Sequence, residues 1–206
     1  MKKTKKDAVQ TRQAILEAAL KTFGKKGYTG SSLEAVAKEA GMTRGAIYWH
    51  FKNKLELLSA VIQKCRRKSE IRLNRILDSP QSPLNKVRHL ICEFFLIVSE
   101  EEEFRVVEEI KVFKSQKKKE LNRLYKEHME NVKEIKALLK GLIKEGIARG
   151  ELDNRIDPDT VVVALISYIG GLKSAWLSGV STFSLKECAE NLADIFINGI
   201  SKKRKE

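Results

Sequence analysis

The residues best suited to binding chemistry lie close together, within residues 31–54. Arg44 carries a forked guanidinium that can donate two hydrogen bonds to O6 and N7 of a guanine. The neighbouring Gly45 has no side chain, so a helix backbone at that point can approach the bases closely. Ser32 and Thr43 stand where helices are expected to begin, and the free N–H groups of a helix N-terminus suit a phosphate. This combination predicts a surface that binds DNA.

Two short helices joined by a tight turn, over residues 31–51, are needed to position these side chains. Ser31 and Glu34 have the spacing of a capping box, which predicts the start of the first helix. Gly41 fits the left-handed residue that ends such a helix, and Thr43 then caps the second. A helix-turn-helix of this kind places its second helix in the major groove of DNA.

Capping signals and apolar periodicity predict helices on both sides of this pair. Asp7 is expected to cap a helix that runs to about Gly24, and Asn53 to cap a long helix that ends near Leu77. Further helices are predicted over about 83–99, 104–114 and 117–148, and two more begin at Asp157-Pro158 and Ser184. The chain is therefore predicted to be all-α, with about nine helices and no strands. An N-terminal helix-turn-helix head precedes a C-terminal helical bundle.

The distribution of charge also favours a nucleic-acid partner for the head. Residues 1–54 hold ten Lys and two Arg against four acids, a net charge of +8, whereas residues 55–200 carry only +2. A basic head on a nearly balanced body suggests contact with a polyanion, although a lysine-rich solvated surface has the same charge. The basic arm, residues 1–6, either follows an adjacent groove or is a solvated tail.

Other classes of protein are poorly supported by the sequence. There is no GxxxxGK[ST], HExxH, GxSxG or GxGxxG motif, so we predict no enzyme, catalytic residue, metal or cofactor. Three widely spaced cysteines and no apolar leader predict a cytoplasmic protein. The longest apolar run, at 161–172, is shorter than the ~20 residues of a membrane span, which predicts a buried helix and no membrane partner. A sequence-independent architectural DNA-binding protein remains an alternative.

The chain resembles the TetR family of transcriptional regulators over about residues 8–58. Residues 11–28 carry the pattern TRxxILxAAxxxFxxxGY, and residues 31–57 carry SSLxxVAxxAGMTRGAIYWHFxxKxxL. Within the family, the TRGAIYWHF run is similar to the AcrR/TtgR-type repressors of multidrug efflux pumps. The resemblance implies a DNA-binding domain at 1–53 and a ligand-binding and dimerisation domain at 54–206.

The resemblance also implies roles for individual head residues. Tyr48, His50 and Lys54 are similar to family residues that touch phosphates. A lysine in the first turn of a helix opposes that helix's dipole, so Lys54 makes better sense facing DNA. Trp49 either packs on sugars and thymine methyl groups or only braces the helix. The predicted DNA contacts are thus Ser32, Thr43, Arg44, Gly45, Tyr48, Trp49, His50 and Lys54.

For the C-terminal part, the resemblance implies a ligand pocket and a homodimer. An apolar helix followed by an amphipathic one at the end of the chain also favours a four-helix dimer interface. Its predicted residues are Val161, Leu165, Ile169, Leu172, Trp176, Leu192, Ile195 and Phe196. An aromatic set at helical spacing is more often core than pocket, and the predicted effector contacts are Ile62, Arg66, Phe94, Phe95, Phe104, Glu108, Phe113 and Trp176.

The expected function is a ligand-responsive regulator that binds a palindromic double-stranded operator as a homodimer. Repression is the family's usual behaviour, and an activator is the alternative. The bases at Arg66, Arg67 and Lys68 argue against a preference for cationic drugs, which leaves an apolar or aromatic effector, neutral or anionic. Such an effector would favour a conformer that releases DNA.

Overall fold

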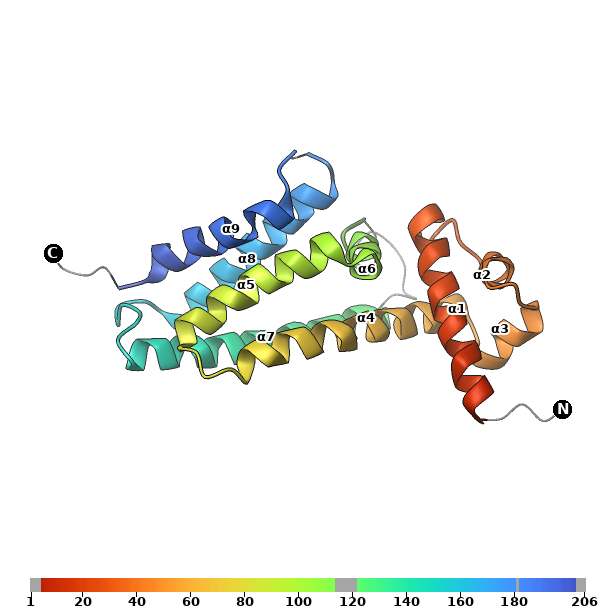
Figure 1. Ribbon diagram of the computed structural model, residues 1–206, viewed down its shortest axis with the longest axis horizontal. Coiled ribbons are helices and arrows are strands. Elements are labelled where there is room, and N and C mark those ends of the chain that lie inside the picture. The colour runs from red at the N-terminus through yellow and green to blue at the C-terminus, as the bar shows by residue number, and fades with distance from the viewer. Residues whose placement is uncertain (1–4, 114–121, 181, 203–206) are drawn as a thin grey trace. The chain divides into compact units, whose positions relative to one another are not determined.

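The computed structural model describes residues 5–113, 122–180 and 182–202, and in these ranges the chain is all-α, as predicted. Nine helices and no strand occur in this described part (Figure 1). The helices are α1 (Lys5–Lys26), α2 (Leu33–Glu39), α3 (Arg44–His50), α4 (Lys54–Leu77), α5 (Pro83–Glu100), α6 (Glu102–Phe113), α7 (Asn122–Ala148), α8 (Pro158–Leu177) and α9 (Leu185–Ile200).

Most of the predicted helix starts are confirmed by side-chain caps. In each case an oxygen of the cap accepts a hydrogen bond from the backbone N–H three residues on, which satisfies one free donor of the first turn. For example, the N–H of Glu56 lies 2.8 Å from Oδ1 of Asn53. The same bond is made by Thr43, Ser82, Asp157 and Ser184.

Two predicted caps are wrong. Asp7 lies inside the first turn of α1, because that helix begins two residues earlier, at Lys5. The cap of α2 is Ser32, whose Oγ accepts from the N–H of Ala35 at 3.1 Å. Ser31 is instead buried, and its hydroxyl donates back to the carbonyl of Gly27. Residues 1–4 of the basic arm, and the predicted start of the long helix at 117, lie outside the described residues.

The chain divides into two compact units, and the first holds the helix-turn-helix. It comprises Met1–Lys68 and Glu103–Asn122, so α1–α3 share a unit with the start of α4 and with α6. A Cβ built on Gly24 of α1 would lie 3.1 Å from Cγ2 of Val106, which shows how closely α6 packs there. Lys64 of α4 adds ion pairs to Glu17 at 3.8 Å and to Glu103 at 3.4 Å.

The second unit comprises Ser69–Glu102 and Arg123–Glu206. In this unit α5 packs along α9 and also contacts α8, so these three helices lie side by side (Figure 1). Arg88 of α5 makes a two-pronged ion pair with Asp194 of α9, with N–O distances of 2.5 and 3.1 Å. Arg72, at the end of α4, binds Glu93 of α5 and the carboxylate of Glu101 beyond it. Paired, forked contacts of this kind fix the orientation of the helices.

The prediction that the apolar helix α8 is buried is wrong within one protomer. The helix has 20 residues and a mean hydropathy of 1.5, so by length and composition alone it could cross a membrane. Only 17% of its apolar window is buried, and Val163 is 55% exposed. The apolar sequence predicts that these residues are shielded from water, but it does not indicate which surface covers them.

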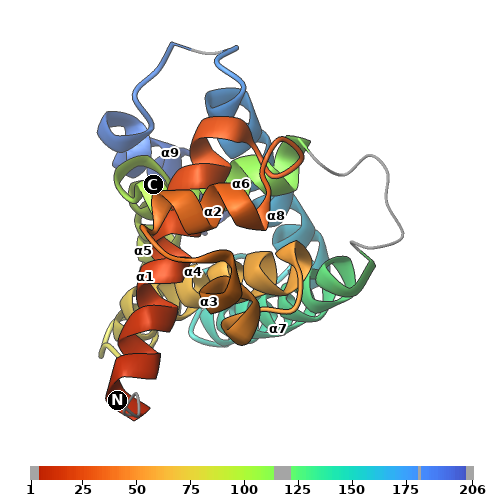
Figure 2. The same ribbon diagram turned by 90° about the vertical axis from the view of Figure 1, so that its right-hand side faces the viewer.

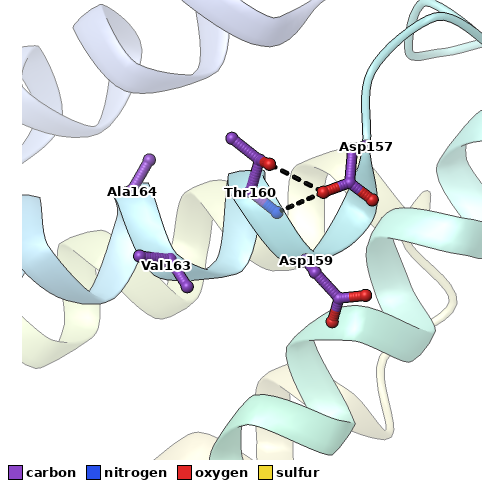
Figure 3. A pocket seen from close by; sticks show the side chains of 5 residues that line it. All are labelled: Asp157, Asp159, Thr160, Val163 and Ala164. Carbon is purple, nitrogen blue, oxygen red and sulfur yellow. Dashed lines mark hydrogen bonds between the residues drawn. The ribbon is translucent and has the colours of Figure 1, made fainter.

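The exposed side of α8 borders a shallow, open hollow of about 380 Å³. Figure 3 shows its lining, in which Asp157 caps the helix through Thr160, and Val163 and Ala164 continue along α8. Asp159 pairs with Lys140 of α7 at 2.6 Å. No residue predicted to contact an effector lines this hollow.

Candidate DNA-binding site

The helix-turn-helix is held in shape by local hydrogen bonds. After α2, Gly41 adopts φ 62°, a left-handed conformation that glycine reaches without steric cost. The N–H of Met42 then returns to the carbonyl of Ala37 at 2.9 Å, which closes the turn. Thr43 caps α3 through the N–H of Ala46 at 3.3 Å. Figure 2 looks onto the grouped helices α1, α2 and α3.

Helix α3 has one buried face and one face open to solvent. Ile47 is fully buried and Phe51, directly after the helix, is 2% exposed, so these two side chains anchor α3 in the core of the first unit. Arg44, Gly45 and Tyr48 lie on the exposed side. A rigid helix that presents a basic and an aromatic side chain outward can carry contacts to bases and phosphates.

The guanidinium of Arg44 is held in place by two neighbours. Its Nε lies 3.0 Å from Oε1 of Glu34, in the first turn of α2. Its Nη2 lies 3.4 Å from the hydroxyl of Tyr48, and the group sits 5.3 Å from the centre of that ring. The predicted base reader is therefore pre-positioned, but through partners that the sequence did not indicate.

The same contacts favour the charged forms of both side chains. The pKa of Glu34 is lowered by a hydrogen bond from its own backbone N–H, by one from the Ser32 side chain and by the charge of Arg44. The pKa of Arg44 is raised by its hydrogen bond with Tyr48 and by the charge of Glu34. Because the carboxylate is favoured over the acid, the pair persists above the ordinary pKa of a glutamate and is lost only as the pH falls below it.

Trp49 and His50 follow on the last turn of α3. Trp49 is 73% exposed, and its ring meets that of His50 edge-on at 4.5 Å between centroids. His50 is half-buried and also lies near the ring of Phe51. So large an exposed area on Trp49 favours its reading as a contact to sugars and thymine methyl groups, which stays a prediction.

Lys54 has a structural role that the sequence did not reveal. Its Nζ donates to the carbonyl of Tyr28 at 2.8 Å and to that of Ser31 at 2.6 Å. It also lies 4.4 Å from the centre of the Tyr28 ring. These contacts tie the start of α4 to the loop before α2, and they explain a cation that opposes its own helix dipole. Its contact with a phosphate stays a prediction.

Replacing Lys54 with alanine separates these two roles. We expect weaker binding to every duplex, and a log–log salt dependence that is flatter by about one, because one phosphate contact is lost. We also expect a lower melting temperature, because two carbonyls lose their donor. Fluorescence anisotropy at several salt concentrations and thermal unfolding measure the two effects. Lys133→Ala on α7 is the control for the loss of one positive charge. An unchanged salt dependence for Lys54→Ala would show that Lys54 has only a structural role.

The predicted effector contacts fall in both units. Ile62, Arg66, Phe104 and Glu108 belong to the first unit, where Glu108 is 4% exposed and Arg66 is exposed. Phe94, Phe95 and Trp176 belong to the second, where Phe95 is fully buried and the other two are half-buried. The side chain of Phe113 lies outside the described residues. The role of the set in binding an effector stays a prediction.

The predicted dimer contacts differ in how much surface they expose within one protomer, and their role in a dimer stays a prediction. Val161 and Leu165 are 4% and 1% exposed, so they pack inside their own protomer. The exposed side of α8 carries Val163, Ala164 and Ser167, and α9 adds Ile195 at 64% exposed. The other predicted positions are half-buried, namely Ile169, Leu172, Trp176, Leu192 and Phe196.

Glu34 and Tyr28 are the site residues that sequence reasoning missed. The Ser31–Glu34 spacing assigned the glutamate to a capping box, so it was not expected to form an ion pair with Arg44. Because the true cap is Ser32, Glu34 lies one position earlier in the helix than a capping box requires. Tyr28 gave no signal, because its contact with Lys54 spans 26 residues.

Models of known families match both parts of the chain. The model of bacterial regulatory proteins of the TetR family matches residues 15–61. The model of the C-terminal region of MAATS-type transcriptional repressors matches residues 82–201, more than half of the chain. The chain belongs to the TetR family, and it is a DNA-binding transcriptional regulator, not an enzyme.

Relatives match along nearly the whole chain. The regulator AcrR of Shigella flexneri is 31% identical over 95% of this chain and 92% of AcrR. The repressor BepR of Brucella suis is 32% identical over 90% of this chain and 89% of BepR. Among solved structures, NalD of Pseudomonas aeruginosa, the secondary repressor of the MexAB-OprM multidrug efflux pump, is 30% identical with a TM-score of 0.81. That match covers 97% of this chain and all of NalD. These matches confirm the resemblance to efflux-pump repressors of the TetR family.

Proposed function

We propose that this regulator is a repressor that binds a palindromic operator as a homodimer and is released by a small, largely apolar effector. The observation that carries the proposal is the outward face of α3, on which Arg44, Tyr48 and Trp49 are exposed while Ile47 is fully buried. One such face reads one half-site, and a two-fold dimer presents two of them to a palindrome.

The homodimer is supported by the uncovered apolar surface of the second unit. Val163 and Ile195 are more than half exposed on the two C-terminal helices, α8 and α9. Two helices from each protomer can form a four-helix interface, and a two-fold interface uses the same surface on both subunits.

The proposed location of the protein is the cytoplasm. Its three cysteines are free thiols, which is typical of proteins in a reducing compartment.

An apolar or aromatic effector is supported by one structural relative. SmeT, which is 25% identical to this chain with a TM-score of 0.79, is described in a complex with triclosan. NalD is described as the secondary repressor of a multidrug efflux pump, which makes an efflux pump the proposed target of repression here. An effector acts by binding more tightly to the conformer that releases DNA, so its differential affinity sets the size of the response.

The test begins by selecting duplexes from a random library with the full-length protein. We expect a palindrome, and we call the selected duplex the operator duplex. Triclosan, used as the probe effector, is expected to lower the affinity for this duplex at least roughly tenfold, within the usual range of allosteric coupling. Expression of a reporter gene placed downstream of the operator sequence should rise when the regulator is removed. A fall in reporter expression would indicate an activator. Binding of triclosan without a change in operator affinity would contradict the proposed release.

A further inference from the structure

Arg44 is restrained on one edge before any DNA arrives. A guanidinium can meet a guanine through the edge with Nε or through the end that carries both Nη atoms. In this structure Nε is 3.0 Å from the Glu34 carboxylate, and Nη2 is 3.4 Å from the Tyr48 hydroxyl. Each Nη carries two N–H groups, so the end that carries both Nη atoms still has donors for O6 and N7, whereas Nε is already engaged. Glu34 thus selects one of two modes of approach.

The restraint also lowers the entropic cost of binding. A free arginine side chain loses considerable rotamer freedom when it is ordered against a base. The contacts with Glu34 and Tyr48 impose part of that order in the free protein. A guanine in the correct position then gains its two hydrogen bonds at a smaller cost.

The charge of Glu34 has the opposite effect on incorrect DNA. Its side chain is 49% exposed and lies 3.0 Å from Arg44 on the exposed face of α3. A carboxylate beside a phosphate backbone weakens every complex through repulsion. At the operator, the hydrogen bonds from the oriented Arg44 to guanine outweigh that repulsion, whereas DNA without the guanine supplies no such gain. Repulsion that only the correct partner overcomes raises specificity.

We propose that Glu34 is a specificity-determining residue, which orients Arg44 for a guanine and penalises DNA that lacks that guanine. This inference rests on the proposed function. It assigns Glu34 no base contact of its own, and its effect on specificity passes through Arg44.

The experiment measures affinities for the operator duplex and for a scrambled duplex of the same composition, at several salt concentrations. For Glu34→Gln we expect tighter binding to the scrambled duplex and a smaller change at the operator, so that their affinity ratio falls roughly fivefold or more. Glu39→Gln is the matched control, because it removes the same charge from the same helix but Glu39 pairs with Lys25 instead. It should leave the ratio unchanged.

Two further variants separate orientation from repulsion. Glu34→Asp keeps the charge but shortens the reach, so we expect weaker operator binding and unchanged binding to the scrambled duplex. In an Arg44→Ala background, Glu34→Gln should no longer alter the ratio. Circular dichroism confirms that each variant is folded, and the exposed position of Glu34 makes unfolding unexpected.

Different failures have different meanings. A wild-type protein that binds both duplexes equally would overturn the proposed function and this inference with it. A normal wild-type ratio that Glu34→Gln leaves unchanged would overturn the inference alone. An equal fall of the ratio with and without Arg44 would also overturn it, because Glu34 would then act independently of Arg44.

Discussion

The Arg44→Ala variant should bind the operator duplex roughly ten- to hundredfold more weakly, and a scrambled duplex almost as well as the wild type does. The position of the Arg44 guanidinium explains this expected result. Arg44 is the first residue of α3, and its guanidinium is held outward by Glu34 and Tyr48. A forked donor in this position reads a base edge, and removing it costs discrimination at one base pair of each half-site.

Fluorescence anisotropy with both duplexes, at one fixed salt concentration, measures the effect. Arg149→Ala, directly after α7, is the matched control, because Arg149 is also exposed and is also paired with a glutamate, Glu145, at 2.6 Å. Repeating the selection from a random library with Arg44→Ala should relax preference at a single position per half-site. Equal weakening on both duplexes would instead make Arg44 a phosphate contact.

An Ile195→Asp variant should be monomeric and should bind the operator duplex roughly a hundredfold more weakly or worse. Ile195 is 64% exposed on α9, the helix that packs against α8. A carboxylate buried without a partner at the centre of an apolar interface is strongly unfavourable. Once the subunits separate, each head binds its half-site alone, and the gain from linked binding is lost.

Sedimentation of the free protein and anisotropy with the operator duplex measure the two consequences. Ile71→Asp is the control, because Ile71 is also an exposed isoleucine, 59% exposed on α4, but belongs to neither of the last two helices. We expect that variant to remain dimeric and to bind as the wild type does. Persistent dimers of Ile195→Asp would show that the interface lies elsewhere.

The helices and most of their ends could be predicted from the sequence because the physics that fixes them is local. A cap such as Asn53 or Ser184 bonds a backbone N–H only three residues away, so the spacing itself carries the information. The same reasoning went wrong at Ser31, because the glutamate three residues on favoured Ser31 over the adjacent Ser32. Tertiary packing buried one of them and left the other as the cap.

The parts that could not be predicted depend on contacts between residues far apart in the chain. Lys54 was read as facing DNA, and only the fold places it on the carbonyls of Tyr28 and Ser31. Likewise, the apolar composition of α8 predicts protection from water, but the covering surface can come from the same chain or from a second copy. Glu34 reaches Arg44 only because the turn at Gly41 brings the two helices together.

The central claim is that two copies of α3 read a palindrome, and a competition between three duplexes tests it most directly. These are the operator duplex, the same duplex with one half-site scrambled, and the duplex with both scrambled, all measured at one salt concentration. We predict that the first binds about a thousandfold or more tightly than the last, as specific regulators do, and that scrambling one half-site removes most of this difference. Equal affinity for all three duplexes would contradict the claim and indicate an architectural protein that binds DNA through its charge alone.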